Sequence, residues 1–191
     1  MKPNLIVSAL VLSTSMLVGQ AMASDSTVHF RGEVIDSACE VTADTAEQNV
    51  DLGKVNRSSF INAGDVAAPT AFQIDLIKCP ATYTKAAVRF DGVEASDGNG
   101  DLAIGDPVKA STPGDYTGTG DATTATGVAI RLYNRADNSQ LKLYEDSTPT
   151  DIDATAGTAS MKFIARYIAI NNAVTPGTAN ADSQFTIVYE K

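Results

Sequence analysis

The stretch that decides how this chain is interpreted lies near its start, where residues 27–34 are Thr-Val-His-Phe-Arg-Gly-Glu-Val. Apolar residues and a glycine occupy the even positions, and the polar residues His29, Arg31 and Glu33 alternate with them. This two-residue period is typical of a half-buried β-strand. No other strand pattern lies close by in the sequence to pair with it. We therefore predict a strand that is offered to another molecule, the alternative being that it folds back as the first strand of its own domain.

The segment in front of this strand has the pattern of an export signal. Lys2 supplies a positive charge, residues 5–18 are an apolar run broken only by Ser and Thr, and Ala21-Met22-Ala23 is a small-x-small cleavage site. The apolar run is too short for a spanning helix, and no later stretch is long enough to cross a membrane. We predict a signal peptide at residues 1–23 and a soluble, exported mature chain that begins at Ser24.

The mature chain is acidic. Removing 23 of the 191 residues leaves 168, a length that suits one domain. The signal segment contains Lys2 and no acidic residue, so 13 of the 14 basic residues remain against all 23 acidic ones, a net charge of −10. Such a surface repels phosphate groups, and we predict that the protein binds neither nucleic acid nor a membrane surface.

Cys39 and Cys79 are the only cysteines of the chain. Export into an oxidising compartment predicts that they form a disulfide. A metal or redox site is the alternative, but the chain has no CxxC motif and a single histidine. We therefore expect a structural disulfide and no bound metal.

The rest of the chain alternates strand patterns with segments rich in turn-forming residues. The strand candidates are residues 48–55, which are the weakest, and residues 72–76, 86–90, 128–132, 140–144, 161–170 and 185–189. Clusters of Gly, Pro, Asp, Thr and Ser separate them, at residues 97–101, 111–127, 146–160 and 171–183. No long window has an amphipathic helical period, so the sequence predicts an all-β sandwich.

The sequence contains no recognisable catalytic constellation. His29 is the only histidine, and it lies on the polar side of the predicted strand with no candidate nucleophile near it in the sequence. Asp97, Asn99 and Asp101 imitate the first ligands of a calcium loop, but Leu102 occupies the position of the required glycine. We predict a plain turn there, and no catalytic residues, cofactor or enzyme activity.

Motifs along the whole mature chain resemble the pilins of the chaperone–usher pathway, in particular the subunits of type 1 fimbriae of Gram-negative bacteria. In chain order the motifs are residues 27–34 followed by Cys39, residues 51–55, residues 71–74 ahead of Cys79, residues 127–130, residues 165–167, and the C-terminal stretch 175–189 with Phe185 and Tyr189. The order and spacing of these motifs are more specific than any one of them alone.

This resemblance implies an incomplete immunoglobulin-like Greek-key sandwich, which lacks its final strand and is completed by a donor strand from another subunit. It divides the chain into the signal peptide (1–23), a donor-strand extension (24–35) and a pilin domain (36–191). The implied donor face consists of Ser26, Val28, Phe30, Gly32 and Val34, with Gly32 at a pocket too shallow for a side chain. The implied strand that borders the groove and contacts the chaperone carries Phe185, Ile187 and Tyr189.

The same resemblance implies a function. It predicts a structural subunit of a surface fimbria, exported through the periplasm, that polymerises by donor-strand exchange and supports cell adhesion. The implied partners are neighbouring pilin subunits, a periplasmic chaperone and an outer-membrane usher. The alternatives are an autonomous exported immunoglobulin-like binding domain and a minor tip or adaptor pilin.

The chain departs from the family pattern in two places. Tyr189 is third from the C-terminus instead of next to last, and only Ser24–Thr27 precede Val28.

Overall fold

The computed structural model describes residues 28–29, 31–32, 38–105 and 124–191. The chain divides into two units, Met1–Ile35 and Asp36–Lys191, and every helix and strand assigned among the described residues belongs to the second unit. The predicted signal peptide and most of the predicted loop 111–127 lie outside the described residues. Residues 28–29 and 31–32 belong to no helix or strand.

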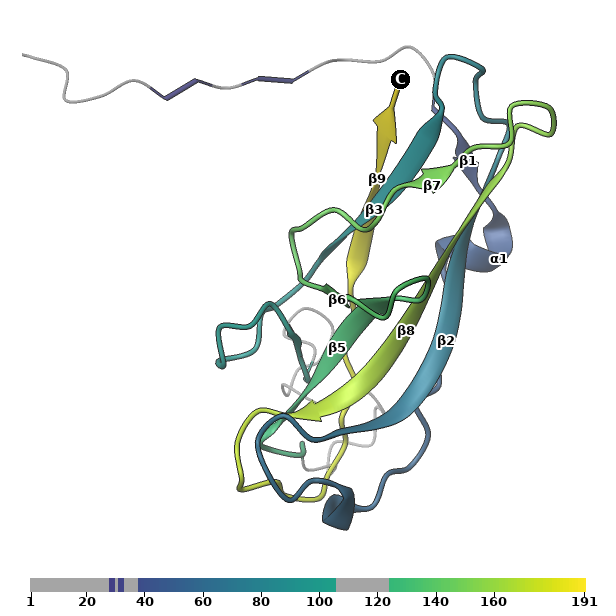
Figure 1. Cartoon of the computed structure of the whole chain (residues 1–191). Coiled ribbons are helices and arrows are strands. Elements are labelled where there is room, and N and C mark those ends of the chain that lie inside the picture. The colour runs from purple at the N-terminus through teal and green to yellow at the C-terminus, as the bar shows by residue number, and fades with distance from the viewer. Residues whose placement is uncertain (1–27, 30, 33–37, 106–123) are drawn as a thin grey trace, which may run out of the picture. The chain divides into compact units, whose positions relative to one another are not determined.

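The second unit is built almost entirely of β-strands (Figure 1). The elements in chain order are β1 (Glu40–Val41), α1 (Ala43–Ala46), the 3₁₀ turn η1 (Arg57–Ser59), β2 (Val66–Ile77), β3 (Lys85–Asp91), β4 (Leu102–Ala103), β5 (Val128–Asn134), β6 (Gln140–Leu141), β7 (Thr150–Asp151), β8 (Ala159–Ala169) and β9 (Gln184–Glu190). The prediction of an all-β fold is confirmed.

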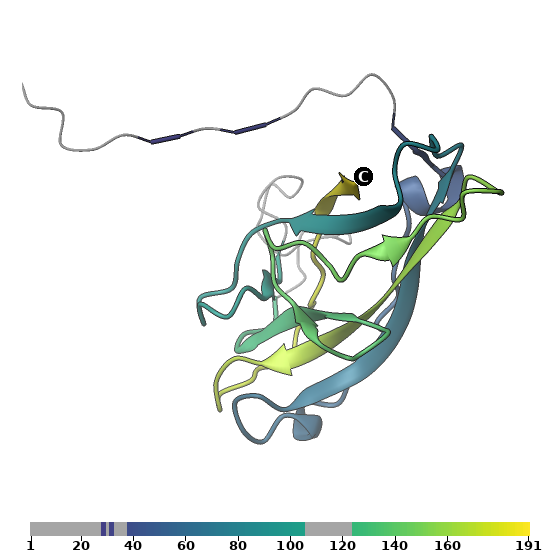
Figure 2. The ribbon, with the colours of Figure 1, turned by 45° about the horizontal axis from the view of Figure 1, so that its top comes forward.

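The strands form two antiparallel sheets. Sheet A has the order β1-β2-β8-β5-β4, with β6 also paired to β5, and sheet B has the order β7-β3-β9. The long strands β2, β8 and β5 lie side by side in both views, and β3 and β9 form the other layer (Figures 1 and 2). Because the consecutive strands β2 and β3 lie in different sheets, the chain crosses between the layers, as it does in immunoglobulin-like sandwiches.

The hydrophobic core lies between the two sheets. Along β8 the buried residues Met161, Phe163 and Ala165 alternate with exposed or half-exposed ones, so one face of sheet A is apolar. Phe90 of β3 meets Phe163 edge to face, with the ring centroids 5.2 Å apart. Burying each such side chain contributes about 1.5–3 kcal/mol to folding, which is why the two sheets stay together.

The strand predictions fail in two places. Residues 48–55 form no strand, because Gly53 adopts a φ of 66° and its backbone N–H donates to the Asp51 carboxylate, which makes a turn. The strand predicted at 140–144 ends at Leu141, and Tyr144 has a φ of 64°, which lies in the left-handed region outside the usual range of strands. Conversely, β1, β4 and β7 were not predicted, and β7 lies within the predicted loop 146–160.

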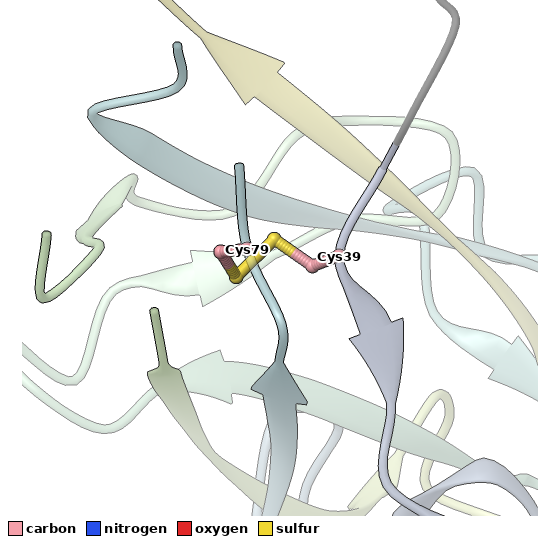
Figure 3. The surroundings of a disulfide bond; sticks show 2 residues. All are labelled: Cys39 and Cys79. Carbon is pink, nitrogen blue, oxygen red and sulfur yellow. A yellow bond between two sulfur atoms is a disulfide. The ribbon is translucent and has the colours of Figure 1, made fainter. Parts of the chain in front are cut away.

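The disulfide between Cys39 and Cys79 is present. It joins the residue just before β1 to a residue just after β2 (Figure 3). The pairing between these strands is short, with only Glu40 opposite Ile77 and Val41 opposite Leu76. The covalent bond therefore holds the start of the domain against sheet A where backbone pairing alone is weak.

Removing this disulfide is expected to destabilise the domain strongly. Replacing both cysteines by serine releases a loop with a sequence separation of 40 residues, and the chain-entropy argument gives a loss of about 3–4 kcal/mol. Urea unfolding of the oxidised protein and of the double variant measures this difference. A loss below about 1 kcal/mol would show that the bond constrains the unfolded chain far less than this argument requires.

Candidate functional site

Strand β9 is an edge strand, and the rest of the domain covers its apolar side chains only in part. It pairs with β3 along all of its 7 residues, and in the described part of the chain no strand pairs with its other edge. β3 buries Ala86, Val88 and Phe90, whereas none of the β9 residues is buried. An apolar strand of this kind leaves both backbone groups and side chains open on one side.

A second partly covered part of the core lies at β1 and the segment that follows it. Val41 of β1 and, further along, Val50 and Leu52 are half-buried and pack against the same core as β9. The segment is attached to sheet A, since the backbone N–H of Thr42 donates to the Asp75 carbonyl oxygen at 3.0 Å. No strand pairing between this segment and β9 occurs among the residues that the structure describes.

Polar contacts mark the two ends of the opening. At one end the Tyr189 phenol is hydrogen-bonded to the backbone of Cys39, and burial raises the pKa of Tyr189 while this hydrogen bond lowers it. At the other end the Tyr167 O–H donates to the Ala179 carbonyl oxygen at 2.9 Å. Burial, and then the negative charge of Asp51, raise the pKa of Tyr167. The first contact joins β9 to the residue just before β1, and the second joins β8 to the segment that precedes β9.

The floor of the opening is aromatic. Phe90 and Phe163 are buried, whereas Phe72 and Phe185 are half-exposed. The ring centroids of Phe72 and Phe185 lie 6.0 and 6.3 Å from that of Phe90. Phe90 and Phe163 thus lie inside the core, whereas Phe72 and Phe185 are partly uncovered at its margin. We call this partly covered margin of the core the β9 groove, and the half-buried side chains that define it are Val41, Val50, Leu52, Phe72, Phe185, Ile187 and Tyr189.

The structure places the residues predicted from the sequence as follows. Phe185, Ile187 and Tyr189 all lie on β9, and all three are half-buried against the core. Val28 is 72% exposed, and a Cβ added to Gly32 would meet no atom within 4 Å. The remaining residues of the predicted donor face, namely Ser26, Phe30 and Val34, lie outside the described residues.

Sequence reasoning missed a buried ion pair in sheet A. Arg131 of β5 donates from Nε and Nη2 to the two carboxylate oxygens of Asp101, at 2.7 and 2.6 Å. The Asp101 side chain has 0% exposure and that of Arg131 has 18%. The hydrogen bond to Asp101 raises the pKa of Arg131, and burial raises the pKa of Asp101. This two-pronged contact fixes the 97–101 turn to β5.

The turn predicted at residues 97–101 is confirmed. Gly98 and Gly100 have φ values of 69° and 76°, and the backbone N–H of Asn99 donates to the Asp97 carboxylate at 3.3 Å. Among the described residues no group of His, Cys, Asp and Glu side chains is arranged to hold a metal ion. Both carboxylate oxygens of Asp101 accept hydrogen bonds from Arg131.

These features define a class of protein, namely two-sheet immunoglobulin-like sandwiches with one disulfide and an open edge strand. Residues 28–190 match the model of the fimbrial protein family. A type-1 fimbrial protein subunit of Serratia marcescens is 39% identical over 194 residues, which cover 99% of each chain. The chain therefore belongs to the fimbrial protein family.

Solved structures agree with this assignment. A Burkholderia pseudomallei antigen and type I fimbria protein has a TM-score of 0.55 and 29% identity, over 81% of this chain and 91% of that one. The P pilus rod subunit PapA shares the fold, with a TM-score of 0.59 and 20% identity over 81% of this chain and all of the other. The immunoglobulin-like sandwich predicted from the sequence is confirmed.

Membership in this family establishes what kind of protein the chain is. It is a structural subunit of a bacterial surface fimbria, and the family is structural and non-enzymatic. Within the residues described, no helix has the length and apolar character needed to span a membrane.

Proposed function

We propose that this subunit polymerises by donor-strand exchange, in which the extension 24–35 of one subunit enters the β9 groove of the next. The observation that carries the proposal is β9 itself, an apolar strand paired on one side only. A strand added to its open edge satisfies the free backbone groups and covers Phe185 and Ile187. The alternating pattern of residues 27–34 is suited to this role, because it offers one apolar face.

The energy available from this insertion is large. Burying Val28, Phe30 and Val34 contributes about 1.5–3 kcal/mol each, or about 5–9 kcal/mol in total before the cost of ordering the strand. Strand hydrogen bonds along β9 add to this. The insertion also completes the core of the receiving subunit, so each link of the fibre stabilises the fold of its neighbour.

The open groove also supports the proposal that helper proteins act before the subunit polymerises. An uncovered apolar edge strand is a template for aggregation. We infer that residues 1–23 direct the chain to the periplasm, that a chaperone covers the groove there through β9, and that an outer-membrane usher exchanges the chaperone for the next extension. The assembled homopolymer, with or without minor subunits, then supports adhesion from the cell surface.

A substitution at Gly32 tests the proposal. Replacing Gly32 by leucine is expected to slow strand exchange at least about tenfold, because a side chain at this position must enter a pocket shaped for none. The rate is measured by mixing chaperone-bound subunits with a peptide of residues 24–34 that carries the substitution. Arg31→Leu is the matched control, since position 31 lies on the opposite side of the strand and should leave the rate nearly unchanged. Equal rates for the two peptides would contradict the assignment of the donor face.

A further inference from the structure

A cavity of about 340 Å³ lies beside the buried ion pair of sheet A, away from the core between the sheets. This volume falls within the range of about 300–1,000 Å³ that is typical of small-molecule sites. The cavity has both polar and apolar lining. The side chains that supply it are Asp97, Asn99, Arg131, Gln140, Ile168 and Ile170.

Two turns that line the cavity are fixed to sheet A. The 97–101 turn is held by the two hydrogen bonds from Arg131 to Asp101. The 62–65 turn is held at the end of β8, where the Gly64 backbone N–H donates to the Ala169 carbonyl oxygen at 2.8 Å and the Ala169 N–H donates to the Asp65 carbonyl oxygen at 2.9 Å. The lining is therefore in place before a ligand arrives, which lowers the cost of binding.

The apolar part of the lining belongs to a second, small hydrophobic cluster. Ile168 is buried there with Ala95 and Ala129, and Ile170 is half-buried against them. Ala129 lies opposite Ile168 in the strand register, and Arg131 lies on the same face of β5 as Ala129. An apolar surface and a guanidinium thus lie side by side at one cavity.

The polar lining offers both hydrogen-bond donors and acceptors. Arg131 uses Nε and Nη2 to bind Asp101, and no described residue accepts a hydrogen bond from its Nη1. The Gln140 Nε2 donates to the Asn99 carbonyl oxygen at 2.8 Å, and among the described residues nothing donates to the Gln140 side-chain oxygen. The Asp97 carboxylate accepts from the Asn99 side chain at 2.9 Å and keeps further lone pairs.

The charges beside the cavity favour a neutral ligand. A carboxylate or phosphate would meet the Asp97 carboxylate, and the counterion that Arg131 needs is already supplied by Asp101. An ammonium group would meet the Arg131 guanidinium. A neutral ligand avoids both repulsions and can still use the donors and acceptors of these side chains.

We propose that this cavity binds a neutral sugar ring. Each hydroxyl group of a sugar both donates and accepts hydrogen bonds, so neighbouring hydroxyls match a lining that combines Arg131 with Asp97 and Gln140. The C–H groups of the ring pack against Ile168 and Ile170. The site lies on the fibrial subunit itself and does not depend on how subunits are joined.

The binding at one cavity is weak. No aromatic ring is among the described residues that line it, and a ligand the size of one sugar ring reaches a Kd of about 1–10 mM at an ordinary efficiency per atom. A fibre repeats the cavity once per subunit, so a glycan with many such rings binds far more tightly than one ring does. The chemistry therefore fits a glycan polymer better than a free sugar.

Saturation-transfer NMR on purified fibres of the full chain tests this proposal. The probes are the methyl glycosides of glucose, galactose and N-acetylglucosamine, and at least one is expected to bind with a Kd of about 1–10 mM. The variant Ala63→Trp places a bulky ring at an exposed position of the lining and should weaken that binding at least about tenfold. Gln140→Ala, which removes one polar partner, should weaken it at least about threefold.

The matched control is Ala81→Trp, which adds the same ring at an exposed position outside the lining. Fibres of this variant should bind the probe as the unmodified fibres do. No saturation transfer to any of the three probes at about 50 mM would overturn the proposal, since a site of this affinity would be nearly full. Binding that survives in both Ala63→Trp and Gln140→Ala fibres would overturn it as well, because the sugar would then lie elsewhere on the fibre.

Three further probes test the chemical class of the ligand. Glucuronate and protonated glucosamine should bind at least about fivefold more weakly than the neutral glycoside, because each carries a charge that one side chain of the lining repels. N-acetylglycinamide, a neutral amide without hydroxyl groups, should bind more weakly too. Tighter binding of any of these three than of the neutral glycosides would overturn the assignment to a neutral sugar.

Discussion

A subunit that lacks Ser24–Val34 is expected to accept chaperone normally and to build no fibres. The deletion removes the strand that fills the next subunit's β9 groove, and it leaves Asp36–Lys191 intact as a unit. Without the donor, each junction loses about 5–9 kcal/mol of apolar burial. Fibre yield counted by electron microscopy, and co-purification with the chaperone from the periplasm, measure the two halves of this prediction.

A matched variant separates the loss of the donor pattern from the loss of chain length. Exchanging Val28 with His29 and Phe30 with Arg31 keeps the composition but moves both apolar side chains to the other face of the strand, since one residue of shift reverses the faces. This variant should fail as the deletion does. Normal fibres from either protein would show that residues 24–34 are not the donor strand.

The second large effect, a loss of folding stability, is expected when the buried ion pair between Arg131 and Asp101 is broken. Replacing Arg131 by methionine should destabilise the domain by about 3–5 kcal/mol, because it leaves the Asp101 carboxylate buried without a positively charged partner. The matched control is Arg89→Met, which breaks a pair with Asp146 whose side chains are 45% and 40% exposed. That loss should be far smaller, because water and salt screen an exposed pair. Urea unfolding of both variants, each measured with a donor peptide bound, gives the comparison.

The pH dependence of the Arg131→Met variant provides an additional test. Burial raises the pKa of Asp101 above its ordinary value, and removing Arg131 removes a group that lowers it. An acid whose folded-state pKa is raised binds more protons folded than unfolded, so stability is lost as the pH rises through that pKa. The variant should therefore recover stability relative to the unmodified protein as the pH falls toward 4. Equal destabilisation at all pH values would contradict a buried Asp101 carboxylate that is ionised and has lost its positively charged partner.

The long strands could be predicted because apolar and polar residues alternate along them with a period of two. Phe185, Ile187 and Tyr189 alternate with polar or less buried neighbours, and this pattern placed β9 correctly within a residue at each end. The disulfide followed from two cysteines and an export signal. The short strands β1, β4 and β7 could not be found in this way, since strands of 2 residues carry no period and exist only through their pairing.

The ion pair was missed for a different reason. Arg131 stands between the apolar residues Ile130 and Leu132, which indicates only that it points away from the core. Its partner, Asp101, is 30 residues away in a segment that the sequence identifies as an ordinary turn. Local patterns predict faces of strands, whereas contacts between distant residues depend on the order of strands in the sheet.

The central claim is that this fold is incomplete until another subunit supplies a strand. Thermal unfolding of the mature chain with and without a synthetic peptide of residues 24–34 tests it most directly. At a peptide concentration about 100 times its Kd, the linkage term of about 2.7 kcal/mol should raise the Tm by at least about 5 °C. A peptide of the same composition with the apolar residues moved to the odd positions should have no effect. A chain that unfolds at the same Tm with and without the native peptide would contradict the account, because its fold would already be complete.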